Sequence, residues 1–252
     1  MDRKIDLNCD MGESFGPYRL GNDELLLPYI TSANIACGYH AGDPLVMERT
    51  VRLAVQHNVA LGAHPGLPDL AGFGRRPMQL SPEEIENIVL YQIGALAAFA
   101  RAAGRALTHV KPHGALYNMA CTDIESARAI ARGVARAGEE LILVGLAGSA
   151  LPEAAQEAGL RSAREGFADR AYQADGSLRS RRLPGAVIED PAAAAAQALQ
   201  IVRDGAVTTF AGGTRALEVD TLCIHGDNPA ALAIVQAIRR RLAEAGIEVV
   251  AL

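Results

Sequence analysis

Tryptophan is absent from this chain of 252 residues, and aromatic residues as a whole make up only 4% of it. Proteins that bind single-stranded nucleic acid stack the bases on aromatic side chains, and this sequence has few to offer. Its formal net charge of −5 also provides no basic surface for a phosphate backbone. We therefore expect no nucleic-acid partner.

Long apolar runs are missing too. No stretch approaches the roughly 18 consecutive apolar residues of a membrane-spanning helix, and the first ten residues, MDRKIDLNCD, become charged too early for a signal peptide. The four cysteines show no C-x-x-C spacing, so they are expected to be reduced thiols that fill small buried volumes. The sequence thus predicts a soluble, cytoplasmic protein that has no membrane partner.

Nucleotide-binding signatures are the third absence. Neither a P-loop nor a G-x-G-x-x-G motif following a strand occurs. If the protein takes part in ATP chemistry, its own sequence does not show how it binds the nucleotide. What the chain does have is apolar residues at half of its positions, enough to build a large core in a single domain over residues 1–252.

Predicted helices and strands alternate along the whole chain. Residues that cap helices, either before a proline or within a capping box, occur at Asp43, Ser81, Thr122, Asp190 and Asn228. The helices are expected near residues 22–30, 43–57, 81–103, 123–137, 149–158, 190–204 and 228–245. The strands are expected near residues 4–9, 33–38, 59–63, 107–112, 141–145, 161–165, 219–225 and 247–251. This alternation is typical of a parallel sheet covered by helices.

The faces of the strands favour a barrel over an open sheet. Central strands of an open doubly wound sheet are covered on both faces and are continuous apolar runs, whereas three strands here alternate polar with apolar residues. Their polar faces carry Asp6, Asn8 and Asp10; His109, Lys111 and His113; and Thr221, Cys223 and His225. Helices would cover the apolar faces, leaving the polar ones to line a barrel that opens at the top. We therefore predict an α/β fold, a closed or nearly closed (β/α) barrel of seven or eight strands.

Four histidines follow apolar runs at matching positions, each with a glycine one or two residues further on. They are His40, His64, His113 and His225, and a fifth cluster, NCDMGE, supplies Asp10 and Glu13 instead. Because ligand-binding loops follow the carboxyl ends of parallel strands, we expect these side chains to share one site. A single histidine is more often structural, as we expect of His57 at a helix end. Four at matching positions indicate an enzyme.

The acidic residues of this site are open to several chemistries. Asp10 and Glu13 are candidates for general base and acid, or for cation binding, although such carboxylates often only cap turns or face solvent. Asp10 with His40, His64 and His113 would also suit a metal ion. No known metal-ligand spacing occurs, however, so the use of a metal stays open.

Basic side chains supply candidates for binding anions. Lys111, between two inward histidines, is placed to hold an anionic substrate or an oxyanion. Further arginines, Arg75, Arg76, Arg179, Arg181 and Arg182, lie in two loops at 65–80 and 171–188 that are long enough to be lids. They can clamp a carboxylate or a phosphate, although loop arginines are commonly only solvated.

Six ordered motifs give the chain a specific resemblance to a known family. They are DLNCDMGESFG (6–16), ANIACGYHAGD (33–43), GAHPGLPDLAGFGRR (62–76), VKPHGALYN (110–118), REGFADRAY (164–172) and TLCIHGDNP (221–229). In these motifs, which extend over nearly the whole sequence, the chain resembles the LamB/YcsF family, the A subunits of bacterial ATP-dependent 5-oxoprolinases.

This resemblance implies both a fold and a reaction. The fold is a barrel related to the glycoside hydrolase/deacetylase group, and the reaction opens 5-oxo-L-proline to L-glutamate with hydrolysis of ATP. It also implies partner subunits B and C, with ATP acting through the complex and phosphorylating the lactam oxygen. Deacetylases of this group hold a metal with Asp and His, but their ligand spacing is absent here, so metal dependence is not carried over.

The resemblance also suggests roles for individual residues. Asp10 or His64 would activate water, while Lys111 and His113 would stabilise an oxyanion. The catalytic candidates are Asp10, Glu13, His40, His64, Lys111 and His113. The substrate-binding candidates are Asp6, Asn8, Asn34, Asp43, Arg75, Arg76, Tyr117, Glu165, Asp169, Arg170, His225 and Asp227. The alternatives are a stand-alone carbohydrate or amide hydrolase and a non-catalytic scaffold subunit. The oligomeric state is left open, a homo-oligomer included.

Overall fold

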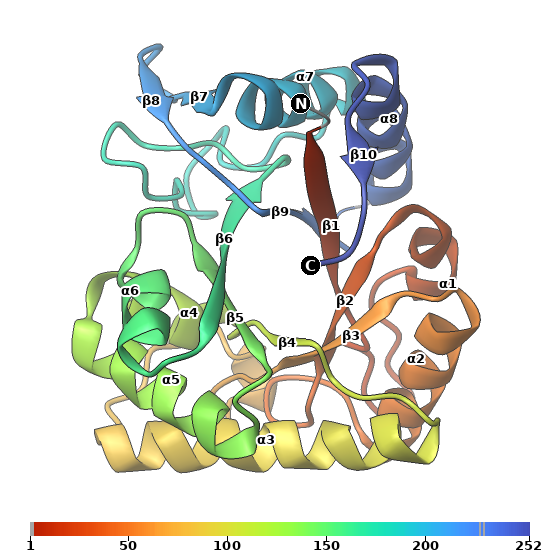
Figure 1. Ribbon diagram of the computed structural model, residues 1–252, viewed down its shortest axis with the longest axis vertical. Coiled ribbons are helices and arrows are strands. Elements are labelled where there is room, and N and C mark those ends of the chain that lie inside the picture. Colours follow the sequence, from red (N-terminus) through yellow and green to blue (C-terminus); the bar gives the residue numbers. More distant parts are fainter. Residues whose placement is uncertain (1–2, 227, 229) are drawn as a thin grey trace.

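Seven parallel strands close into a barrel at the centre of the molecule (Figure 1). The computed structural model describes residues 3–226, 228 and 230–252. Around the barrel the order is β1 (Lys4–Met11), β2 (Ser32–Ala36), β3 (Ala60–His64), β4 (His109–Val110), β5 (Ile142–Leu146), β6 (Arg161–Phe167) and β9 (Thr221–His225). Pairing of β9 with β1, from Thr221 opposite Asp6 to His225 opposite Asp10, closes the ring. The predicted closed α/β barrel is confirmed.

Helices surround the ring of strands (Figure 1). They are α1 (Asp23–Leu26), α2 (Pro44–Gln56), α3 (Pro82–Ala102), α4 (Gly114–Thr122), α5 (Ile124–Ala137), α6 (Ala150–Glu157), α7 (Pro191–Asp204) and α8 (Ala231–Glu244), with short 3₁₀ helices η1 (Leu27–Tyr29) and η2 (Leu70–Gly72). Ile5, Leu7 and Cys9 of β1 belong to one continuous buried core with apolar residues of the helices. Within the described residues, no helix combines the length and apolar character needed to span a membrane.

Most predicted helix starts are confirmed by their caps. Asp43, Ser81 and Asp190 accept hydrogen bonds from first-turn amides of α2, α3 and α7. Two expected caps are wrong. Asp123, and not Thr122, accepts the bonds from the first turn of α5. Helix α8 begins at Ala231, so Asn228 does not cap it, and the Asn228 side chain accepts instead from the amide of Ala230. Prolines following Asp43, Ser81 and Asp190 hold the backbone in a helical conformation without losing an intrahelical hydrogen bond.

The sequence does not predict α4 or the hairpin formed by β7 (Ala206–Thr208) and β8 (Thr214–Ala216). Helix α4 begins directly after His113 without a side-chain cap, so no local signal marks its start. Each strand of the hairpin has three residues, too few to show alternation. The predicted C-terminal strand is present as β10 (Glu248–Val249), which pairs with β1.

The two ends of the barrel differ in chemistry. Near the amino ends of β5 and β6, Ile142, Val144 and Ala163 form a small apolar cluster against which Leu252 packs. The C-terminus accordingly lies within the ring in Figure 1. The polar side chains described below gather instead at the carboxyl ends of the strands, where a cavity opens.

Candidate active site in the barrel mouth

A cavity of about 730 Å³ opens at the carboxyl ends of the strands, a volume in the usual range for small-molecule sites. Strand ends and parts of both long loops form its walls. Of the predicted site residues, the lining includes Asp10, His64, Arg75, Arg76, Lys111, His113, Tyr117, Arg170 and His225. The fold thus brings together side chains that are distant in the sequence.

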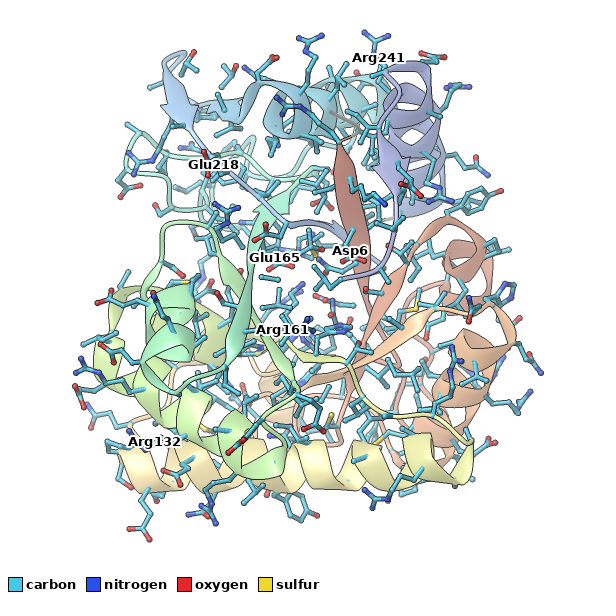
Figure 2. All side chains as sticks on the ribbon, in the orientation of Figure 1. Asp6, Arg132, Arg161, Glu165, Glu218 and Arg241 are labelled. Atoms are coloured by element: carbon cyan, nitrogen blue, oxygen red, sulfur yellow. The ribbon has the colours of Figure 1, made fainter. Side chains whose placement is uncertain are left out.

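Lys111 lies on the cavity floor, surrounded by acidic groups. Its Nζ is 2.9 Å from Asp10 Oδ1 and 2.9 Å from Glu165 Oε1, and it donates to Cys223 Sγ at 3.0 Å. Figure 2 shows Glu165 pointing into the ring of strands. Burial lowers the pKa of Lys111, but Asp10 and its other acidic neighbours more than offset this and hold the pKa well above its ordinary value. Lys111 is therefore a fixed positive charge inside the barrel.

A layer of hydrogen-bonded polar residues supports this floor from beneath. Asp6 accepts hydrogen bonds from three hydroxyls, those of Thr31, Ser32 and Thr221. Asn34 donates to both Asn8 Oδ1 at 2.7 Å and Asp10 Oδ1 at 2.9 Å. Asp6, Asn8 and Asn34 were predicted to bind substrate. Their contacts instead place them below the cavity, where they orient the residues that line it.

Backbone carbonyls fix the rings of His64 and His113. Because a carbonyl only accepts, His64 Nδ1 donates to the Lys111 carbonyl at 2.7 Å and His113 Nε2 donates to the Phe73 carbonyl at 2.9 Å. His64 Nε2 then lies 3.3 Å from Asp10 Oδ2. Burial raises the pKa of Asp10, but His64 and Lys111 outweigh it and hold this pKa well below its ordinary value. Asp10 is therefore an ionised carboxylate facing the cavity.

Glu13 and His40 lie behind this histidine pair. The His40 ring stacks on His113, with centroids 3.7 Å apart and planes 4° from parallel. Glu13 Oε1 is 3.5 Å from His40 Nε2 and 3.6 Å from His113 Nδ1. Burial lowers the pKa of both His40 and His113 well below the ordinary value, which favours neutral rings. These two predicted catalytic residues, Glu13 and His40, are thus close to the cavity but buried at its edge.

The wall formed by α4, β6 and β9 consists of two hydrogen-bonded pairs and one aromatic ring. Tyr117 donates its hydroxyl to Glu165 Oε2 at 2.6 Å, and His225 Nδ1 donates to Asp169 Oδ1 at 2.9 Å. The Phe167 ring stacks on His225, with centroids 5.5 Å apart. Phe167 was not predicted, yet it follows Glu165 by two positions in β6. The period of two along a strand places both on the same face.

Arginines form the rim of the cavity. Arg75, Arg76, Arg170, Arg181 and Arg182 all contribute to its lining. Arg76 is held by Asp69, whose Oδ1 lies 2.9 Å from Arg76 Nε. Arg170 donates to two backbone carbonyls of the 171–188 loop, and burial lowers its pKa to about 10, which leaves it charged at neutral pH. The rim therefore attracts anions.

One predicted binding residue, Asp43, is not brought into the cavity. Its carboxylate accepts hydrogen bonds from backbone amides, those of Leu45, Val46 and Gly16. Asp43 is a helix cap that also ties the loop after β1 to α2. Asp227, another predicted binding residue, lies outside the described residues.

Below the cavity floor, Gly62 leaves space for the ring of His109, so a larger residue at position 62 should destabilise the protein. A Cβ at Gly62 would lie 2.0 Å from His109 Nε2, the atom that contacts Asn34 Oδ1 at 2.9 Å. We expect Gly62→Ala to displace His109 and to lower the free energy of unfolding by about 1–3 kcal/mol, as measured by denaturant unfolding. Gly94→Ala in α3 is the control. Apart from the backbone of α3 itself, no atom of the described residues lies within 4 Å of its added Cβ, so this change should stabilise the helix by up to about 1 kcal/mol. Equal effects of the two changes would contradict this account of Gly62.

Comparison with known proteins assigns the chain to a family. The sequence profile of the LamB/YcsF family matches residues 5–252. The chain belongs to the LamB/YcsF family. It is 62% identical over 252 residues to the 5-oxoprolinase A subunit of Methylococcus capsulatus, covering 100% of this chain and 97% of that protein. It is 57% identical over 246 residues to the 5-oxoprolinase A subunit of Pyrococcus furiosus, covering 98% and 96%.

Solved structures agree with this assignment. A lactam utilization protein from Thermus thermophilus is 52% identical and superposes with a TM-score of 0.94, covering 99% of this LamB/YcsF chain and 100% of that one. A T48 deacetylase, 16% identical with a TM-score of 0.52, covers 99% and 88%. At that identity the likeness concerns the barrel alone, so the chemistry of this LamB/YcsF protein has to be argued from its own residues.

Proposed function

We propose that this chain is the A subunit of an ATP-dependent 5-oxoprolinase, a hydrolase that opens the cyclic amide 5-oxo-L-proline to L-glutamate. Relatives 57% and 62% identical carry that subunit name, and the similar Thermus protein is described as a lactam utilization protein. The observation that carries the proposal is the position of Lys111 beside Asp10 on the cavity floor, below a rim of arginines.

The substrate matches this distribution of charge. 5-Oxo-L-proline has a carboxylate, which suits the arginine rim. It also has a lactam carbonyl, on whose oxygen negative charge develops when a nucleophile attacks. The Lys111 ammonium supplies fixed positive charge for that oxygen, with His113 beside it in the lining.

Coupling to ATP follows from the stability of the amide bond. Transfer of the γ-phosphoryl group to the lactam oxygen makes the ring carbon a better electrophile and releases ADP. Addition of one water to that carbon and cleavage of the ring C–N bond, with a proton going to the nitrogen, leaves an acyl phosphate of glutamate. A second water then releases phosphate and L-glutamate. Each phosphorylated species carries additional negative charge that the arginine rim is placed to hold.

Two pairs of residues, Asp10 with His64 and His225 with Asp169, are assigned to the proton transfers. Asp10, ionised and held by Lys111 and Asn34, accepts a proton from the attacking water, with His64 alongside its other oxygen. On the neighbouring strand β9, where His225 is the pairing partner of Asp10, His225 supplies the proton to the leaving nitrogen and is oriented by Asp169 through Nδ1. Tyr117, hydrogen-bonded to Glu165, adds a hydroxyl to the same wall.

Partner subunits complete the proposed enzyme. The chain has no P-loop, so we assign the nucleotide site to the B and C subunits, whose existence the naming of the relatives as A subunits suggests. Such an enzyme works in the cytoplasm, where ATP is supplied.

Glutamate release from 5-oxo-L-proline tests this function. The purified chain should release no glutamate alone or with ATP, and should do so only when ATP and cognate B and C subunits are all present. Turnover by the chain alone would indicate a stand-alone amide hydrolase instead. No release in a complete mixture, when the same B and C subunits are active with a different A chain, would point to a different lactam.

A further inference from the structure

A second cluster of potential ligands lies beside Asp10, where four elements meet. It consists of Glu13, His40, His64 and His113, whose ligand atoms all lie within 4.8 Å of one another. Glu13 follows β1, His40 precedes α2, His64 ends β3 and His113 precedes α4. All four residues are buried. These residues are far apart in the sequence, and their spacing matches no known metal-binding motif. They come together only because the strands form a barrel.

The tautomers of two of these histidines leave lone pairs facing each other. His64 Nδ1 and His113 Nε2 both carry hydrogens, since each donates to a backbone carbonyl. In the neutral rings, His64 Nε2 and His113 Nδ1 are then both acceptors, yet they lie only 3.0 Å apart. Such a pair needs a cation between or beside the two nitrogens, either one extra proton or a metal ion. Histidine ligands whose second nitrogen donates to a carbonyl are typical of metal sites.

The separations of the ligand atoms suit a transition-metal ion. Zinc–nitrogen bonds of about 2.0–2.1 Å in a tetrahedral site put neighbouring ligand atoms about 3.3 Å apart. Here the two histidine nitrogens are 3.0 Å apart, and Glu13 Oε1 is 3.6 Å from His113 Nδ1. His64 and His113 both line the cavity, which gives an ion a path of entry.

His40 does not ligate the same ion in its present orientation. An ion lies near the plane of each imidazole that binds it, and the planes of His40 and His113 are parallel at a centroid distance of 3.7 Å. Neither ring nitrogen of His40 has a hydrogen-bond partner among the described residues, although the side chain is 0% exposed. Its Nε2 is 3.5 Å from Glu13 Oε1, so His40 contacts the carboxylate ligand and not the ion.

We propose that Glu13, His64 and His113 bind one divalent transition-metal ion, of which Zn²⁺ is the best match to their nitrogen and carboxylate donors. His40 packs against His113, and its Nε2 lies 3.5 Å from Glu13 Oε1. An ion there would supply a Lewis acid next to Asp10 at the cavity wall. This proposal does not require that the substrate be 5-oxo-L-proline, because it is argued only from the positions of these side chains.

A competing cluster, Asp10 with Cys223 and His225, is a weaker candidate. Its ligand atoms also lie within 4.8 Å of one another, but the Lys111 ammonium already contacts Asp10 and Cys223, at 2.9 and 3.0 Å. A second cation there would be repelled. Burial also raises the pKa of the Cys223 thiol well above its ordinary value, which opposes the thiolate that a metal needs.

Metal titration of the purified chain tests the proposal without any assay of activity. After treatment with a chelator and its removal, the chain should bind one equivalent of Zn²⁺ in calorimetry, and Co²⁺ should give the visible absorption of a site with nitrogen and oxygen ligands. Glu13→Gln, His64→Gln and His113→Gln should each weaken binding by more than about 100-fold, since loss of an outer partner alone costs 10–100-fold. His57→Gln, on the exposed end of α2, is the matched control and should bind normally.

Three results would overturn the site. One is the absence of stoichiometric binding by the unaltered chain, which would mean that the two histidines share a proton instead. Another is normal binding by His64→Gln and His113→Gln variants whose circular dichroism matches the unaltered chain. The third is a thiolate-to-cobalt charge-transfer band that disappears in Cys223→Ser, which would place the ion in the competing cluster. None of these outcomes depends on whether the chain belongs to a 5-oxoprolinase.

Discussion

Lys111→Met should lower the free energy of unfolding by about 3–5 kcal/mol, the usual result of removing one partner from a buried ion pair. The ammonium of Lys111 is the positive charge that balances Asp10 and Glu165, both within 2.9 Å of it. Methionine has a similar length but no charge, so two carboxylates would be left close together in the barrel interior. Denaturant unfolding followed by circular dichroism measures the effect.

The chain provides a matched control for this change, because Lys4 is its only other lysine. Lys4 pairs with Glu248 at 3.0 Å on the surface, with its side chain 60% exposed, and Lys4→Met should cost at most about 1 kcal/mol. The double change Lys111→Met with Glu165→Gln should recover part of the lost stability, since it removes one of the two uncompensated charges. Similar costs for the two lysine changes would show that the buried pairing is not what stabilises the floor.

Asp10→Asn should reduce glutamate release by the reconstituted complex by about 10²- to 10⁴-fold, the usual contribution of a general base. Asparagine keeps the size of the side chain and can still accept a hydrogen bond from Lys111 or Asn34. It cannot take a proton from water. We expect the loss in kcat, with a smaller change in KM, because Asp10 acts on water and not on the substrate carboxylate.

Asp204→Asn is the control for this experiment, because Asp204 pairs with its neighbour Arg203 on the surface at the end of α7. It should leave glutamate release unchanged. Full activity of both Asp10→Asn and His64→Ala would contradict the assignment of catalysis to this cavity. That result would favour a scaffold subunit whose pocket only binds the substrate.

The barrel was predictable because its signal is local. Alternation of polar and apolar residues along β1 places Asp6, Asn8 and Asp10 on one face of the strand, independently of the rest of the sequence. The helix caps mark where each helix begins, and the preceding strand must end before that point. The positions of the histidines after apolar runs likewise predicted that their loops would meet at one end of the barrel. These features depend on residues a few positions apart.

The contacts within the site were not predictable, because they join residues far apart in the sequence. The stacking of His40 on His113 requires close approach by two loop glycines, since a Cβ at Gly66 would lie 2.6 Å from His40 Nδ1 and one at Gly74 would lie 2.9 Å from His113 Cδ2. Nothing in the local sequence indicates such a fit. Asp43 was predicted to bind substrate but caps α2. The sequence alone does not distinguish a carboxylate that caps a helix from one that binds a ligand. The catalytic and binding roles themselves stay predictions.

The pairing of β1 with β9 determines when the barrel can be completed during synthesis. Until residues 221–225 leave the ribosome, β1 and β6 each lack their neighbour on one side, and unpaired strand edges invite association with other chains. Asp6 and Asp10 on β1 and Glu165 on β6 face the interior of the unfinished barrel. Inward charges of this kind oppose pairing with a foreign strand. We therefore expect the residues that build the cavity floor also to disfavour association of the nascent chain with other chains.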